Sequence, residues 1–143
     1  IDMRPPSVGI EIVAAGFPGG EVHVERLQVS APPTILKGQI TEVYPGGGDT
    51  PTTFPRFVTD VDFPAGMSGG PVFSKDNGSL IGVVSRGGLG QGRAALLWNL
   101  AVHNLPCGNT LKSYKSAGKF DALGIDFVTL KDDRPIYDSS GRL

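Results

Sequence analysis

The sequence predicts an all-β domain, because turn-forming residues are frequent and the apolar runs between them are short. Of the 143 residues, 21 are glycine and 12 are proline, and they are spread along the whole chain. The runs that they separate contain Val, Ile and Phe, which is typical of short strands joined by tight turns. A chain of this length can bury one core without disulfides, so we expect a single domain over residues 1–143.

Charge and composition exclude several classes of function. The formal net charge is −1, which provides no field to attract nucleic acid or an anionic membrane surface. No apolar run approaches the roughly 20 residues that a membrane-spanning helix needs. The single cysteine, Cys107, cannot form an internal disulfide, so composition leaves the compartment open. We therefore expect neither a nucleic-acid nor a membrane partner.

The first 59 residues are predicted to contain five strands. An apolar run from Val8 to Ala14 precedes a glycine-rich turn, and residues 21–25 alternate polar and apolar side chains. Residues 27–43 hold two strands around Pro32-Pro33, residues 44–55 have the composition of a loop, and residues 56–59 return to strand character.

The second half is predicted to begin with a hairpin and to end in a helix. Asn77-Gly78 lies between the apolar runs 71–73 and 80–84, which is a strong hairpin signal. Residues 94–102 fit either a strand or a short helix. Asn109 can cap a helix over residues 110–117 that Gly118 ends, and a last strand is expected near residues 125–130.

The segment Gly66-Met67-Ser68-Gly69-Gly70 carries the clearest chemical signal. A serine hydroxyl is a weak nucleophile, so acyl transfer needs a base and donors that hold the developing oxyanion. Glycines allow unusual dihedral angles and a close backbone approach, so the amides of Gly66 and Ser68 can both point at one carbonyl oxygen.

Residues 66–72 resemble the nucleophile motif of the chymotrypsin/trypsin family of serine proteases. Thr59-Asp60 lies where the HtrA-like bacterial branch has a Thr-Asp pair, and Ser85-Arg86-Gly87 resembles the Ser-Trp-Gly of the substrate-pairing strand. Upstream, residues 15–19 and 38–40 are similar to the turn and strand that open the second barrel. A short glycine string is often only a flexible turn, but ordered matches on both sides, over residues 8–100, argue against that interpretation.

The resemblance implies a six-stranded antiparallel Greek-key β-barrel, the second barrel of the chymotrypsin fold, followed by a short C-terminal helix and tail. The chain starts with Ile1 rather than methionine, in a segment of linker composition, so we expect a mature or cut piece of a longer protein. The expected parts are a linker over residues 1–7, a barrel over 8–104, and a helix with a C-terminal extension over 105–143.

The resemblance also implies Ser68 as nucleophile, and Gly66 and Ser68 as the oxyanion hole. The family's histidine and aspartate precede these segments, on an N-terminal barrel that this chain lacks. His23 and His103 are interpreted as surface or hydrogen-bonded histidines. We therefore expect the chain alone to be nearly inactive, with a polypeptide substrate and the missing barrel as partners, and with no metal or organic cofactor.

Specificity is expected from Asp62 and from the strand Ser85, Arg86 and Gly87. Asp62 lies six residues before Ser68, where the trypsin-like pattern has a carboxylate that selects Lys or Arg. The alternatives are a solvated turn residue at position 62, or an apolar wall made by Phe63 and Pro64. Met67 replaces the aspartate that pairs with a new N-terminus in classical members, so activation by N-terminal insertion is not expected.

Two other interpretations concern residues 85–94. Residues 87–94 superficially resemble a phosphate-binding loop, but Arg93-Ala94 replaces the required Lys-Ser/Thr, so we expect a loop at a pocket edge instead.

The principal function expected is a serine endopeptidase half. The alternative is a non-catalytic β-barrel, or a degenerate protease relative, that binds extended peptides along Ser85 to Gly87 by strand addition.

Overall fold

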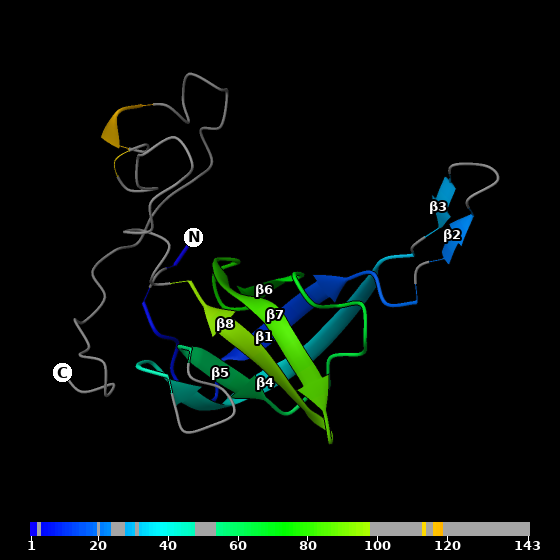
Figure 1. Ribbon diagram of the computed structural model, residues 1–143. Helices are drawn as coiled ribbons and strands as arrows, with labels where there is room; N and C mark the ends of the chain where they lie inside the picture. Colours follow the sequence, from blue (N-terminus) through cyan, green and yellow to red (C-terminus); the bar gives the residue numbers. More distant parts are fainter. Residues whose placement is uncertain are drawn as a thin grey trace.

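The computed structural model describes residues 1–2, 4–19, 21–23, 28–30, 32–47, 54–97, 113 and 116–118. Within these ranges the protein forms a six-stranded barrel and a separate two-stranded hairpin (Figure 1). The strands are β1 (Glu11–Gly16), β2 (Glu21–His23), β3 (Gln28–Ser30), β4 (Thr34–Tyr44), β5 (Arg56–Thr59), β6 (Pro71–Ser74), β7 (Leu80–Gly88) and β8 (Gln91–Leu96).

The barrel closes in the order β1-β4-β5-β8-β7-β6, and all six neighbouring pairs are antiparallel. Closure leaves no strand exposed along the whole edge of a sheet, which removes a common site of aggregation. The all-β, six-stranded antiparallel prediction is confirmed.

Alternation of side chains along the strands produces the core. In β1, Ile12 and Ala14 are fully buried, and the residues between them face outward. Phe57 of β5 is also fully buried, and its ring occupies the space beside Gly82 of β7, where a Cβ would lie 2.6 Å from Cε1. The core cluster consists of Ile12, Ala14, Ile40, Phe57, Phe63, Met67, Val72, Ile81, Val84, Ala94 and Leu96.

The connection from β5 to β6, residues 60–70, crosses one end of the barrel. It must do so because β5 lies between β4 and β8, whereas β6 lies between β1 and β7. Its side chains Phe63 and Met67 are buried in the core cluster, and Asp60 anchors its start by exchanging hydrogen bonds with the backbone of Gln39. The connection that carries Ser68 is therefore packed into the barrel at several points along its length.

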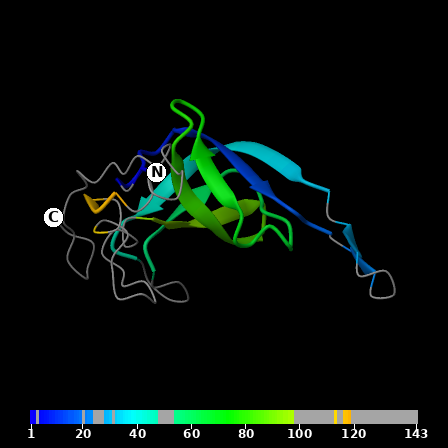
Figure 2. The ribbon, with the colours of Figure 1, turned by 90° about the horizontal axis from the view of Figure 1, so that it is seen from above.

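The connection from β1 to β4 contains the β2–β3 hairpin, which projects from the barrel (Figures 1 and 2). The prediction of two strands around Pro32-Pro33 is confirmed, since β3 ends at Ser30 and β4 begins at Thr34. His23 is the last residue of β2, and its side chain lies outside the described part of the structure.

The predicted hairpin at Asn77-Gly78 is confirmed. β6 and β7 pair across residues 75–79, Gly78 has a φ of 68°, and the Asn77 side chain accepts a hydrogen bond from the amide of Ser79. Lys75 in this hairpin forms a 2.6 Å ion pair with Glu11 of β1, at a position where both side chains are about half exposed.

The prediction of a loop over residues 87–94 is wrong. β7 extends to Gly88 and β8 begins at Gln91, so Leu89-Gly90 is a two-residue turn in which both φ angles are positive, 58° and 77°. This is the φ pattern of a type I′ turn, which matches the twist of paired strands. Gly87 and Gly92 of this segment therefore lie in paired strands, where the missing Cβ makes room for Phe63.

The structure describes part of each end of the chain. Residues 1–7 were expected as a linker, but the amide of Asp2 donates to the carbonyl oxygen of Leu80, and Ile1 packs with Leu97. Of the predicted helix 110–117, the structure describes one bond from the Ala117 amide to the Ser113 carbonyl oxygen, followed by Gly118 at a φ of 65°. Its other residues, Asn109 and the strand near 125–130 lie outside the described residues. In the described part, no helix is long and apolar enough to cross a membrane.

Candidate active site

Ser68 is exposed at an open cavity of about 490 Å³ on one end of the barrel. The cavity is lined by the end of β1, the residue after it, the residue before β4 and the turn that carries the serine: Ala15, Gly16, Phe17, Pro33 and residues 66–71. The Ser68 Oγ donates to the carbonyl oxygen of Ser85 at 3.4 Å, which is a long hydrogen bond. The structure therefore places Ser68 beside Ser85, the first residue of the segment predicted to bind substrate.

The backbone around Ser68 leaves two particular amides available. The amides of Met67, Gly69 and Gly70 donate to the carbonyl oxygens of Pro64, Val84 and Met67, at 3.1, 2.8 and 2.9 Å. Among the described residues, the amides of Gly66 and Ser68 have no acceptor. An unpaired amide at an exposed turn is a donor for an incoming oxyanion, and these are the two amides that the sequence indicates.

Gly66 adopts a conformation that other residues rarely accept. Its φ is 93°, and an added Cβ would lie 3.1 Å from the Cα of Pro18 and 3.2 Å from the carbonyl oxygen of Phe17. Any side chain at position 66 would therefore strain the turn and press on the β1–β2 connection. The orientation of the Gly66 amide depends on this glycine.

No base lies next to Ser68 in the described part of the chain. The acceptor of its hydroxyl is a backbone carbonyl oxygen, which cannot take the proton in an acyl transfer. His103 and the side chain of His23 lie outside the described residues. In the same part of the chain, no three His, Cys, Asp or Glu side chains form a group that could hold a metal ion.

One edge of β7 is open beside Ser68. β6 pairs with β7 as far as Val83, and Val84 then exchanges hydrogen bonds with Gly69 and Gly70. From Ser85 to Gly88, the described residues give β7 a strand partner on the β8 side alone. The predicted substrate-binding residues Ser85, Arg86 and Gly87 thus form a short strand edge that begins at the nucleophile.

Asp62 does not line the cavity beside Ser68. Its Oδ1 accepts the backbone amide of Gly88 at 2.5 Å, so the carboxylate ties residues 60–70 to the end of β7. This contact favours a structural role for Asp62 over selection of a basic substrate side chain.

Phe63 packs inward between β7 and β8. A Cβ on Gly92 would lie 2.5 Å from the ring, and a Cβ on Gly87 would lie 1.9 Å from the Phe63 carbonyl oxygen. Only 3% of Phe63 is exposed, whereas Pro64 is exposed. Of the predicted apolar wall, Phe63 alone is buried, and its backbone lies directly against β7.

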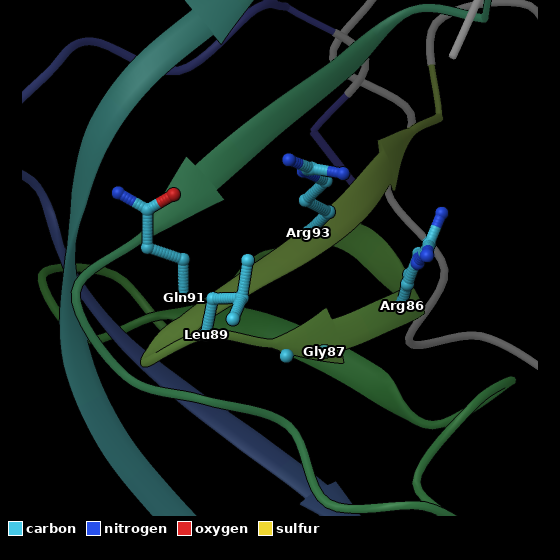
Figure 3. A pocket seen from close by; sticks show the side chains of 6 residues that line it. Arg86, Gly87, Leu89, Gln91 and Arg93 are labelled. Carbon is cyan, nitrogen blue, oxygen red and sulfur yellow. The ribbon is translucent and has the colours of Figure 1, made fainter. Parts of the chain in front are cut away.

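Sequence reasoning missed a second arginine near the strand edge. Arg86 of β7 is directly opposite Arg93 of β8, and both line a cavity of about 80 Å³ together with Leu89 and Gln91. Figure 3 shows the side chains of these four residues on the same side of the β7–β8 hairpin. Equal spacing of Arg86 and Arg93 from the Leu89-Gly90 turn was the signal that could have revealed the pair, but it required the hairpin register.

A six-stranded antiparallel barrel with an exposed serine in a glycine-bounded turn across one end defines a barrel of the chymotrypsin fold. Comparison with known families agrees, since the trypsin-like peptidase domain matches residues 2–83, more than half of the chain. The chain belongs to the trypsin-like peptidase domain family. The matched region includes Ser68 and ends before Ser85. No curated protein sequence matches the chain.

Proposed function

We propose that this chain is the nucleophile-bearing second barrel of a trypsin-like serine endopeptidase of the HtrA-like bacterial branch. The observation that carries the proposal is the state of the turn around Ser68. Its hydroxyl is exposed at a cavity, and among the described residues the amides of Gly66 and Ser68 are the two in this turn without an acceptor. Two such donors beside an exposed hydroxyl are the arrangement that an oxyanion hole requires.

The reaction proposed is hydrolysis of a peptide bond through an acyl-enzyme. Ser68 Oγ attacks the carbonyl carbon while a histidine base takes the hydroxyl proton, and the oxyanion is held by the amides of Gly66 and Ser68. The C–N bond then breaks, and the protonated base gives the proton to the leaving amine. Water cleaves the resulting ester and restores Ser68. The base and its aspartate are assigned to the missing N-terminal barrel, on the same or another polypeptide.

The substrate is proposed to bind as an added strand along Ser85, Arg86 and Gly87. Main-chain hydrogen bonds to an open strand edge provide affinity without requiring a particular sequence. The open edge of β7 starts at Ser85, whose carbonyl oxygen is 3.4 Å from the nucleophile, so a peptide on this edge has a carbonyl carbon within reach of Ser68. Asp62 is assigned the role of holding residues 60–70 against the end of β7, because its carboxylate already accepts a hydrogen bond from the Gly88 amide.

A non-catalytic peptide-binding module, or a degenerate protease relative, is the second candidate. It is favoured by one observation, that the described residues place no base beside Ser68. It requires the same strand edge but no histidine from elsewhere.

Labelling with a fluorophosphonate probe separates the two candidates. Four proteins are compared: this chain, the chain extended at its N-terminus by the preceding residues of its parent, and the Ser68→Ala variant of each. We expect rapid labelling of the extended protein, very slow labelling of the isolated chain, and none of the variants. Absence of labelling at Ser68 in a folded extended protein contradicts the peptidase proposal and leaves the binding module.

A further inference from the structure

Arg86 and Arg93 lie on the same face of the β7–β8 hairpin, and within the described residues neither has a carboxylate partner. Arg86 and Arg93 are opposite each other in register, so their side chains share one face of the sheet (Figure 3). Like charges directly opposite on neighbouring strands are destabilising. In the described part of the chain no ion pair relieves this repulsion.

Two acidic side chains among the described residues, Asp62 and Glu42, already accept hydrogen bonds from other groups. Asp62 accepts the Gly88 amide, and Glu42 accepts the hydroxyl of Tyr44. Because Arg93 lowers the pKa of Tyr44 through its charge, its guanidinium lies close enough to act on that part of the surface, yet Glu42 remains bonded to Tyr44. Since neither arginine has an acidic partner among the described residues, an anionic group from outside can pair with them.

The cavity beside the two arginines has the form of a small binding site. It measures about 80 Å³, which is room for a small polar group such as a carboxylate. Leu89 forms one side of the cavity, is fully exposed, and has a φ of 58°. An exposed, strained leucine at a cavity edge is costly, and such strain is found where a surface binds a partner.

We infer that Arg86 and Arg93 select an acidic side chain, Asp or Glu, in the peptide bound on the β7 edge. The inference rests on the proposed peptide site. In that site the attacked carbonyl belongs to the residue opposite Ser85, so the preceding residue of an antiparallel peptide lies opposite Arg86. Residues directly opposite each other share a face of the sheet, so that side chain points to the arginine side of the hairpin. The substrate class is a peptide with an acidic residue immediately before the residue at which it is cut.

The test measures binding of two fluorescein-labelled nonapeptide pools that differ only in a central Glu or Gln, with the other positions randomised. The protein is the full chain carrying Ser68→Ala, so that no peptide is consumed, and fluorescence anisotropy gives the affinity. We expect the Glu pool to bind about three- to tenfold more tightly, because a charge-assisted contact at a partly exposed site has roughly that effect. The preference should shrink at high salt, since exposed charges are screened.

Three further variants identify the residues responsible. Arg86→Gln and Arg93→Gln should each bring the two pools to nearly equal affinity, whereas Lys37→Gln, which removes one positive charge from an exposed site on β4, should keep the preference. Thermal melting confirms that each variant is folded. Equal binding of the Glu and Gln pools by the unmodified arginine pair overturns the inference, as does a preference that survives both arginine variants.

The outcome is separable from that of the proposed peptidase function. Fluorophosphonate labelling of Ser68 together with equal affinities for the two pools removes the acidic preference and leaves the peptidase. Acidic preference without labelling retains the subsite on a non-catalytic peptide-binding module. Failure of both pools to bind overturns the subsite together with the peptide-binding edge.

Discussion

The hydroxyl of Ser68 lies 3.4 Å from the carbonyl oxygen of Ser85, and this contact joins the β5–β6 connection to strand β7. Ser68 belongs to residues 60–70, and Ser85 of β7 follows Val84, whose backbone bonds Gly69 and Gly70 of that connection. Ser85 also lies at an irregularity between Val84 and Arg86, where its Oγ donates to the carbonyl oxygen of Arg93 at 3.1 Å. The nucleophile and the proposed substrate edge are thus fixed relative to each other within one barrel.

Replacing Gly66 by alanine should impair Ser68 chemistry more than it impairs folding. A Cβ at φ 93° is strained and lies 3.1 Å from the Cα of Pro18. The turn must therefore shift, which moves the amide of residue 66 away from the position of the oxyanion. We expect at least about a tenfold slower fluorophosphonate labelling of the N-terminally extended protein, in line with the loss of one oxyanion donor.

Gly78→Ala is the matched control for Gly66→Ala. Gly78 has a similarly positive φ of 68° in the β6–β7 hairpin, but no atom lies within 4 Å of its added Cβ. It should lower the free energy of unfolding by about 1 kcal/mol without slowing labelling. Equal labelling rates for the two variants would remove Gly66 from the oxyanion hole.

Replacing Phe63 by alanine should destabilise the barrel strongly. The Phe63 ring fills the space above Gly92, and only 3% of the residue is exposed, so truncation leaves a cavity at the end of the barrel. We expect a loss of about 3 kcal/mol in the free energy of unfolding, measured by urea denaturation. Phe17→Ala is the control, because 57% of Phe17 remains exposed, and it should cost less than about 1 kcal/mol. Similar losses in both variants would mean that Phe63 does not hold the crossing connection in place.

The pKa of Tyr44 should fall toward its ordinary value when Glu42 is replaced by glutamine. Tyr44 donates a hydrogen bond to Glu42, and this bond, with burial and the Glu42 charge, raises the pKa above 10.0 against the opposing charges of Arg56 and Arg93. A raised pKa means that the fold favours neutral tyrosine, so the stabilisation is present below pH 10 and is lost as the pH rises through the folded-state pKa.

Ultraviolet titration of tyrosinate measures this pKa change. The chain has three tyrosines, so the signal of Tyr44 is obtained as the difference between each protein and its Tyr44→Phe variant. A Tyr44 titration that is identical with and without Glu42→Gln would show that the Glu42 contact is not made in solution.

The sequence anticipated the strands better than it anticipated the contacts between them. Alternation in β1 and the turn residues at Pro32-Pro33 and Asn77-Gly78 are local signals, and each led to a correct element. Closure of the barrel could be predicted only from the family resemblance, because neither strand alone contains a signal for the pairing between β1 and β6.

Failures of prediction arose where distant residues decide the structure. Glycine usually marks a loop, yet Gly87 and Gly92 lie opposite each other in β7 and β8, where a missing Cβ admits Phe63. The spacing of Asp62 from Ser68 suggested a pocket floor, but its partner is the amide of Gly88, 26 residues away in the chain. Neither contact has a signal within a few residues of the positions concerned.

Leu89 offers the most direct test of the hairpin that carries the arginine pair. Its φ of 58° at the first position of a two-residue turn is one that asparagine or glycine accepts more readily than leucine. We therefore expect Leu89→Asn to raise the free energy of unfolding by about 0.5–1 kcal/mol in urea denaturation, and Leu89→Val to lower it, because a branched Cβ is disfavoured at positive φ. If Leu89 is retained for binding, Leu89→Asn should also weaken binding of the Glu and Gln peptide pools alike, since it removes an apolar wall and no charge. A more stable asparagine variant with unchanged affinity would assign the strain to the turn alone, and an asparagine variant less stable than the parent would contradict the turn geometry itself.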